Sequence, residues 1–185
     1  MEETRSALGV VDVQNDLVDS QGAAGHWADL GPCRSCVSTM IPTARRFRSL
    51  GQLVIYVRSE YGPATDSPAV RDRPPPSANA SGNAPLICGA GTWRSELYRV
   101  RPEPADRIIT KHRYSGFVGT DVGFTLRAQG VSTVFFGGVT TDVCVDSTPR
   151  DEFMRDFENV TLEDRCAAYD RQAHEHTLRT FRAAA

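Results

Sequence analysis

Short apolar runs that alternate with helical patterns constrain this chain more than any other feature of its sequence. Residues 7–13 and 52–58 are nearly unbroken hydrophobic segments, and 107–110, 131–136 and 159–162 are shorter ones. Buried strands that alternate with helices imply right-handed crossovers and a parallel sheet covered on both faces. We therefore predict an α/β fold, a three-layer α/β/α sandwich with a central, mainly parallel sheet.

The segments between these strands have apolar residues at the spacing of a helix. Apolar residues recur at that spacing from Ile41 to Leu50, and Gly51 suits the end of a helix. The other expected helices cover 120–129, 142–156 and 170–182.

The whole chain, 1–185, is predicted to form a single domain. Its 185 residues are 40% hydrophobic and 24% charged, which is ordinary for a globular protein. Residues at about 59–92 break the rhythm and hold six of the eleven prolines. A linker would have to join two domains, and neither side of this segment can stand alone. We therefore expect a long irregular loop that serves as a lid or a subunit contact.

Charge and hydropathy exclude several classes of partner. The 21 basic and 23 acidic residues leave a formal charge of −2, with no basic footprint for nucleic acid or membrane surfaces. No apolar run approaches the roughly 20 residues of a membrane helix. The first residues lack the order of a signal peptide. We expect a cytoplasmic protein that binds neither nucleic acid nor membranes.

Five cysteines, an odd number without an export signal, argue against a disulfide framework. Cys33 and Cys36 form a lone CxxC, and no second pair stands at the spacing of a structural zinc site. We interpret these two residues as thiols in a surface turn after Gly31 and Pro32.

Polar residues follow four of the predicted strands. Asp12, Arg58, Lys111 and Cys144 lie at or just beyond the carboxyl ends of successive strands. Because ligands bind beyond these ends in parallel sheets, an acid, a cation and a thiol are predicted to converge at one edge.

Cys144 is predicted to lie in the first turn of a helix. The backbone N–H groups and the helix dipole there would lower the pKa of its thiol. The same N–H groups could hold an oxyanion formed when the thiolate attacks a carbonyl. The alternative is a small thiol that packs between helix and sheet.

Asp12 and Lys111 also have two interpretations. A carboxylate and an ammonium beside a buried sheet cost free energy unless they pair, which predicts a structural ion pair. Near a thiol, Asp12 could accept the thiol proton and pass it to a leaving nitrogen, while Lys111 stabilises the negative charges. The two interpretations are compatible.

Three segments carry recognisable motifs: Val11–Asp16, Lys111–Phe117 and Gly138–Val145. In order and separation they resemble the signatures of the isochorismatase-like cysteine hydrolases. Leu162–Ala168 also fits the last strand of that family.

The resemblance implies a catalytic triad of Asp12, Lys111 and Cys144 that works through a covalent acyl-enzyme. It also implies a cis peptide bond between Val139 and Thr140. The N–H groups of Thr140 and Cys144 would then form the oxyanion hole.

Within that family, Gly91–Trp93 followed by the Lys111 motif is most similar to the ureidoacrylate, N-carbamoylsarcosine and biuret amidohydrolases. The implied substrate is a small linear amide or ureide. Nicotinamidases carry an Asp-x-His metal motif where this chain has Arg58–Glu60, so we expect no metal and no cofactor. His174 and His176 are interpreted as solvent-facing or capping residues.

Two other functions are compatible with the sequence: a vinyl-ether hydrolase of the isochorismatase type, and a catalytically silent binding protein of the same fold. The family resemblance also implies a homo-oligomer, a dimer or tetramer.

Aromatic side chains are expected to shape a slot for the substrate, and Arg58 is expected to hold a carboxylate. Two alternatives stay open: Phe117 belongs to the core, and Arg58 pairs with Glu60 or Asp66. The candidate substrate-binding residues are Arg58, Trp93, Tyr114 and Phe117.

Overall fold

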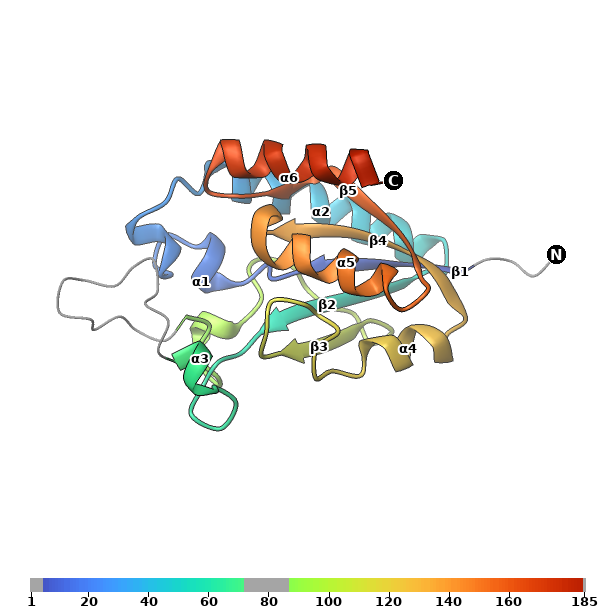
Figure 1. The fold of residues 1–185 in the computed structure, drawn as a ribbon, viewed down its shortest axis with the longest axis horizontal. Helices are drawn as coiled ribbons and strands as arrows, with labels where there is room; N and C mark the ends of the chain where they lie inside the picture. The colour runs from blue at the N-terminus through green and yellow to red at the C-terminus, as the bar shows by residue number, and fades with distance from the viewer. Residues whose placement is uncertain (1–4, 72–86, 185) are drawn as a thin grey trace.

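The computed structural model describes residues 5–71 and 87–184. Within them, five strands form one parallel sheet in the order β3-β2-β1-β4-β5 (Figure 1). This arrangement confirms the predicted α/β fold. The strands are β1 (Arg5–Val11), β2 (Leu53–Ser59), β3 (Arg107–Lys111), β4 (Val131–Val139) and β5 (Glu158–Ala167).

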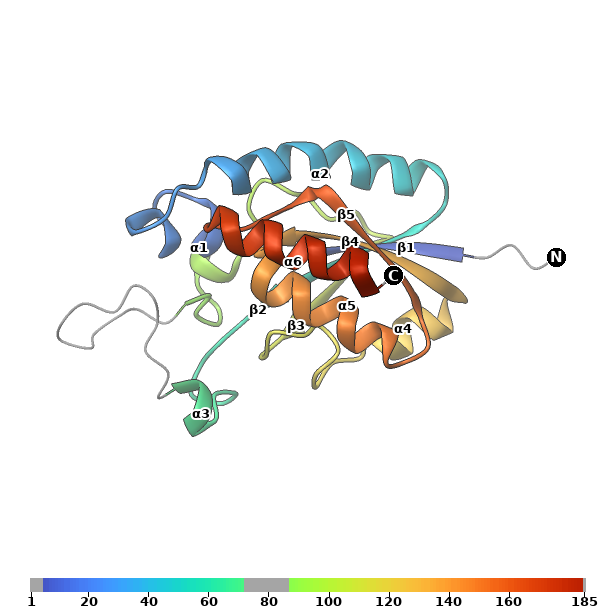
Figure 2. The same ribbon diagram turned by 45° about the horizontal axis from the view of Figure 1, so that its top comes forward.

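Helices cover both faces of the sheet. In Figure 2, α2 runs above the sheet, α4 and α5 lie below it, and α6 lies in front beside α5. The three-layer prediction is therefore confirmed. The helices are α1 (Asn15–Val18), α2 (Gly31–Ser49), α3 (Pro68–Arg71), α4 (Val122–Ala128), α5 (Asp146–Phe153) and α6 (Arg171–Ala184), with 3-10 turns η1 (Ala24–His26) and η2 (Trp93–Ser95) and a π-helical turn η3 (Thr141–Val145).

Each face of the sheet has its own apolar core. Leu8 and Val10 of β1 pack with residues of α2, whereas Ala7 and Val11 pack on the opposite side with Leu126 of α4. Successive side chains of a strand point to opposite faces, so a strand buried on both sides reads as an unbroken apolar run. This explains the sequence signal of the central strands.

The CxxC pair does not lie in a surface turn. Helix α2 begins at Gly31, with Pro32 in its first turn, where the missing N–H of proline costs nothing. Cys33 and Cys36 therefore lie on a buried stripe of α2, with exposed fractions of 0% and 3%. The surface-turn interpretation was wrong, because the helix starts ten residues before Ile41, where its apolar periodicity begins.

Three predicted boundaries also differ. Strand β1 ends at Val11, and Asp12 leaves the sheet with a φ of 50°, its N–H donating to the carbonyl of Val57. The helix expected over 142–156 is divided into the π-helical turn η3 and the shorter α5. Strand β5 continues to Ala167 rather than stopping at 162.

The long loop after β2 is described only in part. Tyr61 pairs with Gly89 in an isolated parallel bridge, which brings the two ends of the loop together. Residues 72–86 lie outside the described residues, so the lid or subunit contact stays a prediction.

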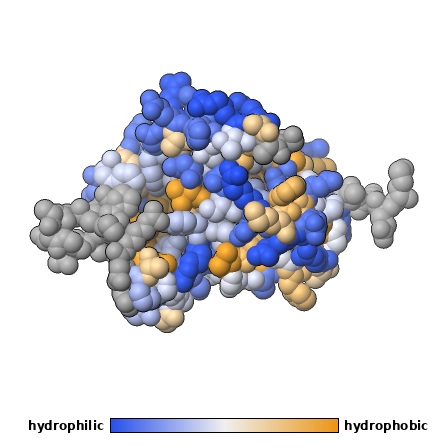
Figure 3. All heavy atoms as spheres, viewed as in Figure 1, coloured by the Kyte–Doolittle hydropathy of each residue, from blue (hydrophilic) through white to orange (hydrophobic). Residues whose placement is uncertain are grey.

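The surface is hydrophilic over α6, as Figure 3 shows. Exposed ion pairs on this helix, such as Arg171 with Glu175, account for that character. In the part of the chain that the structure describes, no helix is long and apolar enough to cross a membrane.

Candidate active site

The carboxyl ends of three strands bring Asp12, Lys111 and Cys144 into contact. Asp12 follows β1, Lys111 ends β3, and Cys144 lies in η3 directly after β4. The Nζ atom of Lys111 is 2.8 Å from Oδ2 of Asp12 and 3.4 Å from Sγ of Cys144. Asp12 and Lys111 are fully buried, whereas Cys144 is partly accessible. The structure thus brings together the acid, the lysine and the thiol at the edge predicted from the sequence.

Ser59, the last residue of β2, joins the same cluster. Its Oγ accepts a hydrogen bond of 2.7 Å from Nζ of Lys111 and donates one of 3.1 Å to Oδ1 of Asp12. Nζ also donates to the carbonyl of Arg113 at 3.0 Å. The buried ammonium and carboxylate are therefore both paired and hydrogen-bonded, the condition under which buried charges are tolerated.

Gln14 fixes the segment that carries Asp12. Its Nε2 donates to the carbonyls of Ser59 and Ser95, each at 2.8 Å, and its Oε1 accepts from the N–H of Ser59 at 2.8 Å. The side chain is fully buried. The sequence analysis did not predict Ser59 or Gln14 as site residues. Ser59 nevertheless lies at the end of a strand, as the predicted Lys111 does.

The charges around Lys111 keep it protonated. Burial alone would lower its pKa, but the negative charge of Asp12, joined by that of Cys144 when it is a thiolate, outweighs that effect and raises the pKa above its ordinary value. Lys111 is therefore a permanent positive charge beside the thiol, not a proton donor.

Burial raises the pKa of the Cys144 thiol well above its ordinary value. The carboxylate of Asp12 raises it further, and the ammonium of Lys111 offsets only part of the increase. This corrects the expectation of a lowered pKa. Desolvation of the thiol and the carboxylate beside it outweigh the dipole of a short turn. A neutral thiol beside a carboxylate favours activation by proton transfer.

Close packing shapes the chain just before the nucleophile. Gly138 has a φ of 138°, and a Cβ there would lie 2.0 Å from the carbonyl oxygen of Val11. Only glycine allows β4 to pass so close to the end of β1. The peptide bond between the next two residues, Val139 and Thr140, is cis. The carbonyl of Thr140 then accepts the N–H of Val145 at 3.1 Å, which closes the π-helical turn.

Helix α6 supports this turn through His174. Nδ1 of His174 and Oγ1 of Thr141 share a hydrogen bond of 2.8 Å, and Thr141 is fully buried. The interpretation of His174 as solvent-facing or capping was therefore wrong, because the topology lays α6 against η3. His176 is exposed, as expected.

The four candidate substrate-binding residues have different surroundings. Trp93 and Tyr114 are exposed to 44% and 40% and stay candidates. Arg58 forms an ion pair of 2.8 Å with Glu60, the alternative that the sequence analysis had kept open. Phe117 is buried in the core, where its ring centroid lies 6.3 Å from that of Phe157, which is likewise the alternative that the sequence analysis had kept open.

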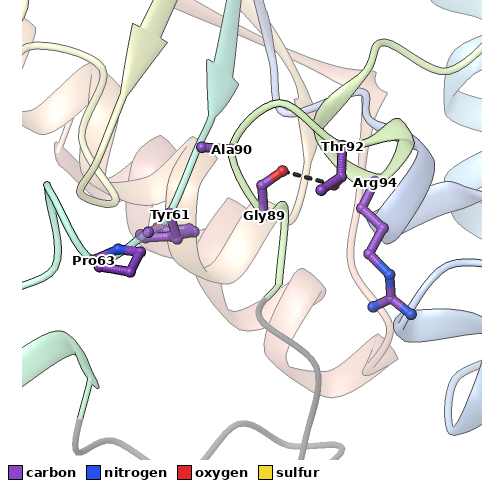
Figure 4. Close-up of a pocket in the computed structure, with 7 residues that line it drawn as sticks. Tyr61, Pro63, Gly89, Ala90, Thr92 and Arg94 are labelled. Carbon is purple, nitrogen blue, oxygen red and sulfur yellow. Dashed lines mark hydrogen bonds between the residues drawn. The ribbon is translucent and has the colours of Figure 1, made fainter.

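A cavity of about 370 Å³ opens beside the cluster, between the two ends of the long loop (Figure 4). Tyr61 lines this cavity, and burial raises the pKa of its phenol, an increase that the nearby charge of Lys111 partly offsets. The lining residues are Tyr61, Gly62, Pro63, Gly89, Ala90, Thr92 and Arg94.

No group of three or more histidine, cysteine and acidic side chains is placed to hold a metal ion among residues 5–71 and 87–184. The chemistry available at the site is that of a thiol, a carboxylate and an ammonium.

A parallel α/β sandwich with a buried acid, lysine and cysteine at its strand ends defines the class of isochorismatase-like hydrolases. The model of the isochorismatase domain matches residues 6–185. The chain belongs to the isochorismatase family.

Its relatives include amidohydrolases. Ureidoacrylate amidohydrolase RutB of Variovorax paradoxus (strain S110) is 34% identical over 175 residues, 86% of this chain and 67% of the relative. The protein of the same name from Methylobacterium radiotolerans is 33% identical, over 85% of this chain and 65% of the relative. The chain thus spans about two thirds of the length of these relatives.

A solved structure supports the same grouping. N-carbamoylsarcosine amidase from Thermoplasma acidophilum matches with a TM-score of 0.75 and 27% identity, over 96% of this chain and 93% of that one.

Proposed function

We propose that this protein is a cysteine-dependent amidohydrolase that cleaves a C–N bond of a small linear amide or ureide. The observation that carries the proposal is the contact of one buried ammonium, Nζ of Lys111, with both Asp12 at 2.8 Å and the thiol of Cys144 at 3.4 Å. The amidohydrolases among its relatives support the choice of bond.

The first half of the reaction forms an acyl-enzyme. Asp12 accepts the proton of the Cys144 thiol as Sγ attacks the carbonyl carbon of the substrate. The resulting oxyanion is held by the N–H groups of Thr140 and Cys144. When the C–N bond breaks, Asp12 returns the proton to the leaving nitrogen, and the acyl group remains on sulfur as a thioester.

The second half releases the acid. Asp12 accepts a proton from water, the hydroxide attacks the thioester carbonyl, and the thiolate leaves and takes the proton back. Lys111 stays protonated throughout and stabilises the thiolate that appears in both halves. Ser59 holds the carboxylate and the ammonium at a fixed separation, because its hydroxyl contacts both Oδ1 of Asp12 and Nζ of Lys111.

Intact-protein mass spectrometry tests the proposal. The protein is mixed with amides, ureides and isochorismate, and quenched within one turnover. An adduct of the acyl mass on the wild-type chain, absent from Cys144→Ala, is the expected result. Turnover of isochorismate without an adduct would favour the vinyl-ether hydrolase, and no turnover of any compound would favour the silent binding protein.

A further inference from the structure

Helix α6 reaches the turn that carries the nucleophile through the imidazole of His174. In Figure 2, α6 lies beside α5, the helix into which η3 continues. His174 lies near the start of α6, where the carboxylate of Asp170 accepts the N–H of Ala173 at 2.7 Å and so caps the helix. Thr177 and Leu178, three and four residues further along, are buried. His174 therefore belongs to the stripe by which α6 packs on the rest of the protein.

The hydroxyl that His174 contacts is hidden from water. Thr141 is fully buried, and its Oγ1 lies 2.8 Å from Nδ1 of His174. This is the one hydrogen bond of that hydroxyl among residues 5–71 and 87–184. Because a buried O–H proton needs an acceptor, we assign the hydroxyl as the donor to Nδ1, with the proton of the ring on Nε2.

The two ends of the turn are supported differently. At the end that carries the nucleophile, the hydroxyl of Thr148 donates to the carbonyl of Cys144 at 2.7 Å and accepts the N–H of Gly116 at 3.1 Å. At the other end, the capping residue Thr140 makes no hydrogen bond through its side chain to the turn. The bond from Thr141 to helix α6 takes the place of that missing cap.

We propose that His174 is a positioning residue of the active site, which aims the N–H of Thr140 at the oxyanion by holding Thr141 in place. Successive peptide groups are rigid planes joined at the Cα atoms, so anchoring Thr141 restricts the plane before it. Donors to an oxyanion are effective only when they are held in place before the reaction. The inference rests on the proposed function, since it concerns the oxyanion of that reaction.

The role of Nδ1 allows a matched set of variants. The amide of asparagine lies about as far from the backbone as Nδ1 of histidine, whereas the amide of glutamine lies one bond further out. His174→Asn should therefore keep the bond to Thr141, and His174→Gln and His174→Leu should lose it. His176→Asn, at the exposed histidine of the same helix, is the control.

Steady-state kinetics on an amide or ureide give the first measurement. We expect kcat to fall about tenfold in His174→Leu and His174→Gln, with KM changed by less than about twofold. His174→Asn and His176→Asn should match the wild type. Thr141→Val, which removes the hydroxyl and keeps the shape, should lower kcat to a similar extent, and adding His174→Leu to it should cause no further loss.

A second measurement needs no hydrolysis. Propionaldehyde adds to a thiol: Sγ of Cys144 bonds to the carbonyl carbon, the thiol proton passes to Asp12, and the carbonyl oxygen takes the negative charge. The aldehyde should therefore protect Cys144 from iodoacetamide. We expect His174→Leu to need about tenfold more aldehyde for the same protection. Without aldehyde its Cys144 should be labelled at the wild-type rate, because alkylation forms no oxyanion.

Several results would overturn the inference. They are equal protection by the aldehyde of His174→Leu and the wild type, no protection of either, an unchanged kcat in His174→Leu, and a loss in His174→Asn as large as in His174→Leu. Slower labelling of His174→Leu without aldehyde would place the effect on the thiol and would also overturn it. If thermal denaturation shows that His174→Leu does not fold, His174→Gln, which keeps a polar side chain, decides instead. Protection that depends on His174 in a wild type that hydrolyses no amide or ureide would support the inference and count against the proposed function alone.

Discussion

The hydroxyl oxygen of Ser59 accepts a hydrogen bond of 2.7 Å from the ammonium of Lys111. The same hydroxyl donates its proton to Asp12, so a neutral side chain bridges a buried ion pair. This bridge leaves the hydroxyl one orientation, because its single proton is used toward the carboxylate. Ser59 is thereby a positioning residue for both charged partners.

Removing this bridge should lower both stability and turnover. Ser59→Ala leaves an acceptor site of Asp12 and a donor of Lys111 unpaired in the interior, at a cost of about 1–3 kcal/mol in the free energy of unfolding. We expect kcat to fall by roughly tenfold, with a smaller change in KM. Urea denaturation and steady-state kinetics measure the two effects. Ser59→Thr, which keeps the hydroxyl, should restore kcat, and failure of that rescue would refute the positioning role.

Cys144 should be indispensable for turnover and slow to alkylate. Cys144→Ala should leave no measurable hydrolysis while the fold, monitored by circular dichroism, is retained. Because burial raises the pKa of the thiol, iodoacetamide should label Cys144 slowly at pH 7 and faster as the pH rises. Peptide mapping of the labelled protein checks this, and rapid labelling at neutral pH would contradict the raised pKa.

Substitution of Asp12 or Lys111 should slow the chemical step more than it weakens substrate binding. Asp12→Asn keeps the size of the side chain and tolerates the left-handed φ of 50°, but it cannot accept the thiol proton. We expect kcat to fall by about 10²–10⁴-fold with little change in KM. Lys111→Met should give a loss of similar kind.

Either variant with the turnover of the wild type would show that the triad assignment is wrong. Because each substitution leaves one buried charge without its partner, thermal denaturation must accompany the kinetics.

The site was predictable from the sequence as far as strand ends could be located. Asp12, Lys111 and Cys144 follow three apolar runs, and a parallel sheet places the ends of such runs at one edge. Ser59 ends the neighbouring strand, but an isolated serine has no charge or spacing that distinguishes it from a surface residue.

The remaining errors arise from burial and packing, which a sequence does not display. The direction of the Cys144 pKa depends on how far the thiol is withdrawn from water. Cys33 and Cys36 were misplaced because a proline-initiated turn of α2 precedes the clear periodicity. His174 reaches Thr141 through the docking of α6, a tertiary contact across 33 positions of the chain.

Activity should survive removal of metal ions. A thiol supplies the nucleophile and Lys111 the fixed positive charge, so the proposed steps need no Lewis acid. Activity after dialysis against a chelator should equal that of the untreated protein. The metal content of both samples is measured alongside. A loss of activity that zinc or manganese restores would indicate a metal-dependent mechanism.

Glu152 should make the stability of the fold fall as the pH rises. Burial raises the pKa of this carboxyl from 4.5 to about 9, and neither of its oxygens has a hydrogen-bond partner among the described residues. The folded protein therefore keeps Glu152 protonated at neutral pH, whereas the unfolded chain ionises it. The stabilising effect is complete below about pH 4.5 and is lost progressively up to pH 9, at about 1.4 kcal/mol per pH unit.

Glu152→Gln removes this ionisation and keeps the shape of the side chain. Its gain in free energy of unfolding over the wild type should be near zero at pH 4.5 and should grow steadily toward pH 8. Urea denaturation at several pH values measures the gain. Glu158→Gln, at an exposed position, is the control and should show no such growth. Parallel stability curves for Glu152→Gln and the wild type over this range would mean that Glu152 is ionised in the folded protein and that its burial is compensated.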